Sequence, residues 1–148
     1  MKIYVAARLA NFKAVRAVQE NLRILGHEIT FDWTQYTQKE DVETQDLVDG
    51  AINDLHGIEK ADALVALLPA KSGTHVEIGM ALALKKIIIL VTPPEHESEF
   101  TVARDACCFY WSPNVVRIIE KYESAAFRAH EILNTVFPSP RSKYESWR

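Results

Sequence analysis

The sequence has little of several features that would mark a secreted, metal-binding or membrane protein. It has two cysteines, Cys107 and Cys108, which are adjacent within an apolar run. Such a pair favours buried free thiols over a disulfide or a metal site. No apolar run reaches the roughly 18 residues that a membrane span needs, and the first ten residues become polar too early for a signal peptide. We therefore expect a cytoplasmic protein that does not bind membranes.

The chain also lacks an excess of positive charge. Its formal net charge is −3, so no basic field indicates binding to a nucleic acid polymer. Of its 148 residues, 48% are hydrophobic and 25% are charged, which is typical of a globular chain with a sizeable core. We expect one domain over residues 1–138, followed by a loose tail over 139–148.

Segments typical of strands alternate with helical patterns along the chain. Strands are predicted at residues 2–7, 27–33, 63–69, 86–94 and 106–111, and helices at about 11–25, 47–60, 74–86 and 113–137. Asn11 is a candidate cap for the first helix and Gly26 a natural end. The polar segment 34–46 is either a loop or the exposed start of a helix. The alternation predicts an α/β fold, a doubly wound sheet of about five parallel strands with helices on both faces.

Doubly wound sheets bind ligands beyond the carboxyl ends of their strands, at the topological switch point. In this sequence the segments at that edge are AARLANF, after the first strand, and PAKSGTHVE, after the third. Most of the polar residues with no obvious structural role lie there. These two segments are therefore the first place to expect a functional site.

Glu77 is the one acid in an otherwise apolar part of its helix, between Val76 and Ile78. Thr74 and Glu77 have the spacing of a capping box, which gives the carboxylate a structural role. The same position has chemical consequences, because a helix N-terminus keeps a carboxylate ionised even when apolar neighbours desolvate it. A carboxylate of this kind at a ligand crevice is a competent nucleophile toward an anomeric carbon. Both interpretations stay open at this point.

Two further polar residues lie close to the predicted strands. The helix at 47–60 has one apolar stripe, made of Val48, Ala51, Ile52, Leu55 and Ile58. Asp54 lies at the edge of this stripe by helical spacing, either as a solvated residue or as a functional one. Tyr4 lies within the first strand, a position that is typical of a tyrosine with its ring in the core and its hydroxyl at the edge of the core.

Three segments together resemble the nucleoside 2-deoxyribosyltransferase family: KIYVAAR, NDLHGIEKADALVALLP and SGTHVEIGMALALKK. The resemblance extends from residue 1 to about 91. It implies a flavodoxin-like, three-layer fold and the movement of a 2-deoxyribosyl group between nucleobases through a covalent intermediate on the enzyme. The partners would be a nucleoside or nucleotide and a free nucleobase, and no cofactor or metal is expected.

The resemblance also implies roles for particular residues. Glu77 matches the nucleophile, Asp54 the residue that handles the proton of the base, and Tyr4 the residue that orients the nucleophile. Glycosidic cleavage builds positive charge on the sugar, which a carboxylate stabilises, and the departing base needs a proton. Further substrate contacts are expected from Ala6, Ala7, Arg8, Leu9, Trp33, Ser72, Gly73, Thr74 and Met80.

One departure from the family pattern opens a second interpretation. Family transferases carry a base-binding aspartate several residues before the nucleophile, where this chain has Lys71 and Ser72. The superfamily also contains 2-deoxynucleoside 5-monophosphate N-glycosidases, which have a serine in this region that meets phosphate. Arg8, Lys71, Ser72 and the amides after Gly73 would suit an anion at a helix N-terminus. The alternative function is therefore hydrolysis of the N-glycosidic bond of (deoxy)nucleoside 5-monophosphates.

A third interpretation is a non-catalytic, nucleotide-sensing module, against which the presence of Tyr4, Asp54 and Glu77 together argues. The resemblance further implies a homo-oligomer, because family sites often lie at subunit contacts. The neighbour's segment over residues 99–105 would close the pocket, with Phe100 and Arg104 as candidates.

Overall fold

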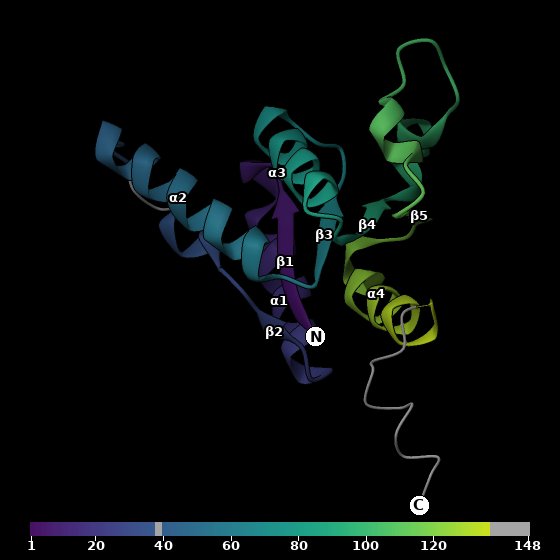
Figure 1. The fold of residues 1–148 in the computed structure, drawn as a ribbon, viewed down its shortest axis with the longest axis horizontal. Coiled ribbons are helices and arrows are strands. Elements are labelled where there is room, and N and C mark those ends of the chain that lie inside the picture. Colours follow the sequence, from purple (N-terminus) through teal and green to yellow (C-terminus); the bar gives the residue numbers. More distant parts are fainter. Residues whose placement is uncertain (38–39, 137–148) are drawn as a thin grey trace, which may run out of the picture.

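The computed structural model describes residues 1–37 and 40–136, which form one parallel sheet covered by helices on both faces (Figure 1). The strands are β1 (Lys2–Ala7), β2 (Glu28–Ile29), β3 (Ala63–Leu67), β4 (Ile87–Thr92) and β5 (Val115–Ile119). The α-helices are α1 (Phe12–Ile24), α2 (Thr44–Lys60), α3 (Ser72–Ala83) and α4 (Tyr122–Val136). Short 3₁₀ helices are η1 (Leu9–Asn11), η2 (Trp33–Tyr36), η3 (Pro94–Phe100) and η4 (Cys108–Trp111). The predicted α/β class is confirmed. The predicted tail at 139–148 lies outside the described residues.

The strand order is β2-β1-β3-β4-β5, and every pairing is parallel. This is the flavodoxin-like order, in which the chain first builds outward from β1 to β2 and then crosses to build from β3 to β5. The switch point therefore lies between β1 and β3, whose last residues Ala7 and Leu67 are paired. Loops that follow these two strands border the crevice predicted from the sequence.

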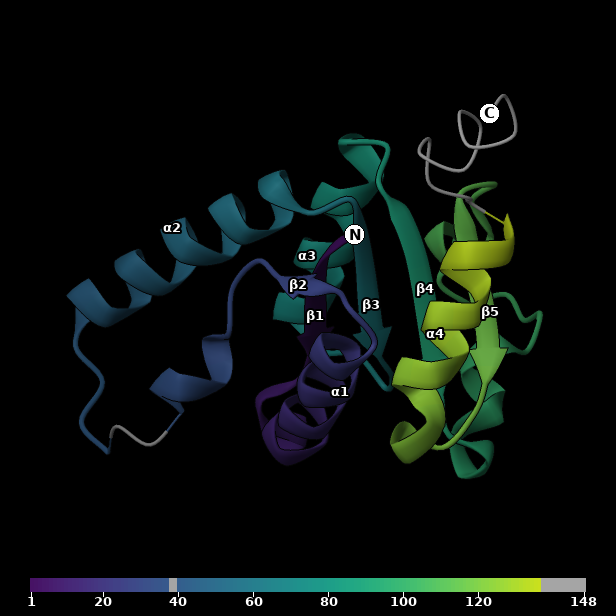
Figure 2. The same cartoon turned by 90° about the horizontal axis from the view of Figure 1, so that it is seen from below.

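Alternate residues of β1 point into different layers, as the two-residue period of a strand requires. Ile3 and Val5 join the core under α1 and α4, whereas Tyr4 and Ala6 join the core under α2 and α3. Figure 2 shows α1 and α4 on one side of the sheet. Tyr4 is fully buried as a residue, but it reaches into the layer that holds α2 and α3.

The C-terminal third departs from the sequence prediction. Residues 106–111 were expected to form the fifth strand, but η4 occupies Cys108–Trp111 and β5 follows it at Val115–Ile119. The reason is burial: of the η4 residues only Tyr110 is buried, whereas VVRII has the β-branched composition of a strand. The helix predicted from 113 begins only at Tyr122.

The prediction of two buried thiols was also wrong. Cys108 is exposed and Cys107 partly buried, although both are free as expected. They lie at a surface turn and not in a buried strand, which explains their exposure.

The second strand is also shorter than predicted, because the chain turns into η2 at Trp33. Gly26 ends α1 with a positive φ of 86°, as expected for a glycine after a helix.

The apolar stripe of α2 does not face the core along its whole length. Ile58 is buried, but Val48, Ile52 and Leu55 are exposed. Only the C-terminal end of α2 packs on the sheet, while its N-terminal half projects beyond it (Figures 1 and 2).

Among the helices described over 1–37 and 40–136, none is long and apolar enough to cross a membrane.

Candidate active site

The hydroxyl of Tyr4 lies between two carboxyl groups at the sheet's switch point. Its oxygen is 2.7 Å from Asp54 Oδ1 and 2.6 Å from Glu77 Oε1. Tyr4 comes from β1, Asp54 from α2 and Glu77 from α3. Asp54 and Glu77 lie 50 and 73 positions after Tyr4 in the sequence, yet both contact its hydroxyl oxygen. The convergence predicted from the sequence is therefore present in the fold.

Gly57 explains why α2 can bring its acid so close to β1. A Cβ at this position would lie 2.8 Å from Cβ of Phe31 and 3.0 Å from the ring of Tyr4. Real Cβ atoms do not approach other atoms this closely, so only glycine fits without a shift of the helix. Asp54 precedes Gly57 by one helical turn and lies on the same face. The acid-x-x-Gly spacing thus places the carboxyl at the tyrosine hydroxyl.

Glu77 does not cap its helix. The N-cap residue of α3 is Lys71, and no side-chain capping bond forms there. Thr74 and Glu77 therefore lie inside the helix, Glu77 in its second turn, and the capping box suggested by their spacing is absent. The carboxyl of Glu77 contacts the Tyr4 hydroxyl and not the free amides at the start of α3. Glu77 is therefore not needed to stabilise the start of this helix.

Burial makes protons unusually hard to remove from this cluster. Desolvation raises the pKa of Glu77 to about 8, although the Tyr4 hydrogen bond acts in the opposite direction. Burial also raises the pKa of Asp54, and it raises that of Tyr4. The expectation that Glu77 is ionised because it lies near a helix N-terminus therefore finds no support in the unliganded protein, where desolvation raises the pKa of this carboxyl.

The geometry requires a shared proton. The Tyr4 hydroxyl has one hydrogen and can donate it to only one carboxylate. The other short contact then needs a protonated carboxyl that donates to the tyrosine oxygen. With the pKa of Glu77 at about 8 and that of Asp54 also raised, the two carboxyls hold one proton between them near neutral pH. One acid and one base are thus available on the same hydroxyl.

A cavity of about 310 Å³ opens beside these groups. It is lined by Ala7, Arg8, Leu9, Trp33, Asp54, Lys71, Gly73, Thr74 and Glu77. Three residues expected to touch substrate do not line this cavity: Ala6 is fully buried in the core, Ser72 is exposed at the start of α3, and Met80 lines a separate groove. The other predicted contacts surround this cavity.

Two polar atoms at the cavity have no hydrogen-bond partner among the residues that the structure describes. Nε of Arg8 and Oγ1 of Thr74 are buried without a hydrogen bond, and both residues line the cavity. Thr74 is only 2% exposed and lies in the first turn of α3. A helix N-terminus attracts anions through its free amide groups. Arg8, Thr74 and the α3 N-terminus therefore form an environment suited to a negatively charged group.

A larger cavity of about 470 Å³ adjoins the first and shares Leu9, Trp33 and Asp54 with it. Its walls include Phe31, Tyr36, Asp49, Gly50 and Asn53, which the sequence reasoning missed. Gly50 lies four residues before Asp54 and therefore on the same face of α2, so helical spacing from Asp54 could have identified it. The aromatic residues carried no comparable signal, because their positions depend on the loop after β2.

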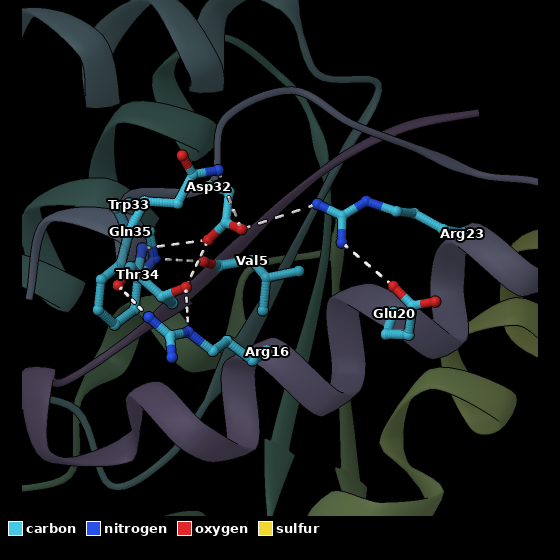
Figure 3. A network of polar contacts seen from close by, with 8 residues as sticks. All are labelled: Val5, Arg16, Glu20, Arg23, Asp32, Trp33, Thr34 and Gln35. Carbon is cyan, nitrogen blue, oxygen red and sulfur yellow. Dashed lines mark hydrogen bonds and ion pairs between the residues drawn. The ribbon is translucent and has the colours of Figure 1, made fainter.

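Trp33 is held at the junction of the two cavities by a polar network (Figure 3). Its ring Nε1 donates to the carbonyl of Val5 over 2.9 Å. Next to it, Asp32 accepts from both the amide and the hydroxyl of Thr34, and Arg16 donates to Thr34 Oγ1 and to its carbonyl. Arg23 lies 3.8 Å from Asp32. The indole is therefore fixed before any ligand binds.

Within the described part of the chain, no group of three or more histidine, cysteine or acidic side chains is arranged to hold a metal. The chemistry available at the site is that of two carboxyls, a tyrosine, an arginine and an aromatic wall. An α/β fold with this constellation at its switch point is suited to acid–base and nucleophilic reactions of a small polar ligand.

The fold is similar to two solved structures. One is the CMP N-glycosidase BcmB of Clostridium botulinum, with 23% identity, a TM-score of 0.58, and coverage of 87% of this chain and 98% of that one. The other is a 2-deoxyribosyltransferase of Bacillus psychrosaccharolyticus, with 19% identity, a TM-score of 0.60, and coverage of 88% and 96%. At these identities the likeness establishes the fold.

The family model for nucleoside 2-deoxyribosyltransferase matches residues 3–116, most of the chain. No curated protein sequence matches significantly. The chain belongs to the nucleoside 2-deoxyribosyltransferase family. The resemblance noted in the three sequence segments is thereby confirmed. The family relationship supports an enzyme of deoxyribosyl transfer or N-glycosidic cleavage that acts on nucleosides or nucleotides.

Proposed function

We propose that the protein cleaves the N-glycosidic bond of a deoxyribonucleoside or its nucleotide and passes the deoxyribosyl group to a second acceptor through an ester with Glu77. The observation that carries this proposal is the Tyr4 hydroxyl bonded to the carboxyls of both Asp54 and Glu77. Both oxygens contact one hydroxyl, at 2.7 and 2.6 Å, so they lie within 5.3 Å of each other, in the short range that is typical of retaining and not of inverting glycosidases. That separation suits a double displacement.

In the first step an oxygen of ionised Glu77 attacks C1′ of the sugar. The bond from C1′ to the base nitrogen breaks, its electron pair stays with the base, and the proton held by Asp54 neutralises that charge. In the second step an acceptor nitrogen or water attacks C1′, loses a proton to Asp54, and releases the Glu77 carboxylate. Tyr4 donates to Glu77 while it is ionised and accepts from protonated Asp54.

The raised pKa of Glu77 is compatible with this mechanism if its proton moves to Asp54 before the base departs. In the empty site the shared proton spends time on Glu77, because its pKa is about 8. The Tyr4 hydroxyl contacts both carboxyls and so offers a path by which the proton moves to Asp54. Positive charge that develops on the sugar favours this transfer, since it stabilises the Glu77 carboxylate. The acid is then protonated at the moment the base departs.

The larger cavity is the proposed site of the nucleobase. It is lined by Phe31, Trp33 and Tyr36, and planar aromatic side chains stack well on bases. Asn53 and Asp54 add polar groups on the α2 wall. The smaller cavity, which contacts Glu77, then holds the sugar.

A second candidate function is hydrolysis of nucleoside 5-monophosphates. A specific observation favours it: the unpartnered Nε of Arg8, just after β1, and Oγ1 of Thr74, in the first turn of α3, belong to two residues that line the cavity that would hold the sugar. A 5-phosphate would satisfy both atoms and interact with Lys71 at the rim. Water, and not a second base, would then be the acceptor.

One substrate panel separates these functions. The protein is incubated with deoxyinosine plus adenine, and separately with each deoxynucleoside 5-monophosphate, and products are followed by chromatography. Deoxyadenosine formation supports the transferase, whereas free base with deoxyribose 5-phosphate supports the hydrolase. Arg8→Ala is the matched variant, because loss of the arginine should raise KM for monophosphates far more than for nucleosides. If no substrate reacts but nucleotides bind, the protein is a non-catalytic sensor and the proposal is wrong.

We also propose a homo-oligomer, in keeping with the expectation from family resemblance. The candidate neighbour segment at 99–105 is partly engaged within its own chain, because Phe100 packs edge-on against Tyr110 with ring centroids 6.3 Å apart. Arg104 is exposed and available to a second copy. Comparing Arg104→Ala with wild type in the same substrate panel tests its contribution, and unchanged kinetics would remove it from the site.

A further inference from the structure

A tyrosine from the layer of α1 and α4 reaches the loops that border the smaller cavity. Tyr122 is the first residue of α4, and it packs against the aliphatic core under α1 and α4, two helices that lie side by side (Figure 2). Its hydroxyl meets residues from the two segments that follow β1 and β3. Tyr122 is not among the described residues that line the cavity, so any effect on the site passes through these segments.

The Tyr122 hydroxyl uses both its donor and its acceptor function. It donates to the carbonyl of Leu68 and accepts from Nδ2 of Asn11 over 3.3 Å. A tyrosine hydroxyl carries a single hydrogen, so the two contacts are compatible and together fix its direction. Burial raises the pKa of Tyr122, so the hydroxyl stays protonated and remains a donor at neutral pH.

Each of these two partners leads to a wall of the smaller cavity. Asn11 ends η1, and its amide donates to the carbonyl of Arg8 over 2.9 Å. Leu68 follows β3 and begins the short loop to Lys71, the N-cap residue of α3. Arg8 and Lys71 both line the cavity. The hydroxyl of Tyr122 therefore joins the loop after β1 to the loop after β3.

The polar groups of the cavity walls do not hold one another in place. Nε of Arg8 and Oγ1 of Thr74 have no hydrogen-bond partner among the described residues. The relative position of these two atoms is therefore set by the backbone segments that carry them. Asn11 was expected to cap α1, but its side chain makes no capping bond and contacts Tyr122 instead. Arg8 lies close enough to Tyr122 for its charge to lower the pKa of the tyrosine against the larger effect of burial.

We propose that Tyr122 is a positioning residue for the smaller cavity: its hydroxyl holds Arg8 and the N-terminal end of α3 at a fixed separation. The inference rests on the proposed function, in which this cavity holds the sugar and any 5-phosphate. A misplacement of about 1 Å far from the chemistry can cost about 100-fold in rate. Loss of the hydroxyl should therefore weaken substrate binding and leave the chemistry at Tyr4 unchanged.

The link between the two loops is tested first without substrate. Tyr122→Phe keeps the ring in the core and removes the hydroxyl. The amide of Phe12 donates to Leu9 and that of His75 to Lys71, so amide hydrogen exchange followed by NMR reports on each wall separately. Both amides should exchange faster in Tyr122→Phe by about fivefold or more, because each loop opens more often without its tie.

Two further variants divide this effect. Asn11→Ala removes the contact to the loop after β1 alone, so the Phe12 amide should exchange faster while the His75 amide keeps its wild-type rate. The matched control is Arg128→Ala, at an exposed position of α4, which should leave both rates unchanged. Wild-type exchange rates in Tyr122→Phe, or equal acceleration in the control, would overturn the proposal.

The consequence for the reaction is measured with the substrates named above, deoxyinosine plus adenine and the deoxynucleoside 5-monophosphates. Tyr122→Phe should raise KM by about fivefold or more and keep kcat within a factor of about three of wild type. A merely structural role would reduce the amount of folded enzyme, which lowers the apparent kcat and leaves KM unchanged. Faster exchange with a wild-type KM would therefore contradict a positioning role.

Failure of the proposed function would give a different result. Wild-type protein would then turn over none of these substrates, while the exchange rates would still respond to Tyr122→Phe. In that case the dissociation constant of deoxycytidine 5-monophosphate, measured by calorimetry, takes the place of KM. A rise of about fivefold or more in the variant would support the positioning role, and equal constants in variant and wild type would overturn it.

Discussion

The two helical layers of this protein are built for different purposes. Under α1 and α4 the sheet is covered by an aliphatic core that includes Val18, Leu22 and Leu133. Under α2 and α3 the same sheet carries a tyrosine bonded to two carboxyls, and the outer surfaces of both helices are apolar and exposed. The alternation of β1 distributes its residues between these layers. Both faces of the sheet have a buried hydrophobic core, but the layer under α2 and α3 also holds ionisable groups whose burial is unfavourable.

The largest difference between the layers should appear on removal of Glu77. Glu77→Ala is expected to lower kcat by about four orders of magnitude or more, because the proposed nucleophile is lost and the remaining carboxyl, Asp54, is needed to handle the proton of the base. The fold should survive, since Glu77 contributes no helix cap. Steady-state kinetics with a thermal melt measures both effects. A variant with more than a tenth of wild-type turnover would remove Glu77 from the chemistry.

The next effect concerns Tyr4. Tyr4→Phe deletes the hydroxyl that joins the two carboxyls and should lower kcat about 100-fold, within the range typical of positioned proton-transfer groups. Tyr110→Phe is the matched control in the same layer, because that tyrosine is also buried but bonds to His75. Equal rate losses in the two variants would indicate a general packing effect instead of a role for the bridge.

The opposite layer should respond through stability alone. Leu22 is a fully buried residue of α1, and Leu22→Ala should lower the free energy of unfolding by about 2–5 kcal/mol. For a chain of this size, that corresponds to a drop in Tm of roughly 5–15 °C. Denaturant titration gives the free energy, and assays well below the new Tm should give kcat within a factor of about two of wild type. A large loss of kcat there would show that the layers are coupled.

The smallest effect is a gain in stability at the site. The pKa of Glu77 is raised from 4.5 to about 8 on folding. The folded protein therefore keeps a proton that the unfolded chain has lost, so wild-type stability falls as pH rises from about 5 to 8. Glu77→Gln does not titrate and should melt a few degrees higher than wild type at pH 8, with little difference at pH 4.5. A difference in Tm that does not change with pH would contradict the raised pKa.

The sequence was informative where local pattern decides structure. The parallel sheet followed from strand–helix alternation, and the convergence of Tyr4, Asp54 and Glu77 followed from their place at the switch point and from family resemblance. The sequence was misleading where one pattern is compatible with two different structures. The stripe of α2 has the spacing of a core-facing helix whether its partner is the core or another molecule, and the Thr74–Glu77 spacing fits a capping box that does not form.

Other features had no sequence signal. The close approach at Gly57 depends on where Phe31 lies, and the aromatic wall of the larger cavity depends on the path of the chain after β2. The pKa of Glu77 is set by burial that arises only when three elements meet. Such properties are tertiary, so they cannot be derived from segments taken one at a time.

The most direct test of the account is to trap the sugar on the enzyme. Wild-type protein is incubated with a 2-fluorinated deoxynucleoside analogue, and separately with its 5-monophosphate, digested with protease and examined by mass spectrometry. Fluorine at C2′ slows release of the ester, so the mass of the fluorinated sugar should appear on the peptide that contains Glu77. Glu77→Ala should show no label, while Leu22→Ala should be labelled as wild type is. Label on another residue, or turnover with no label on Glu77 under any condition, would contradict the covalent mechanism proposed here.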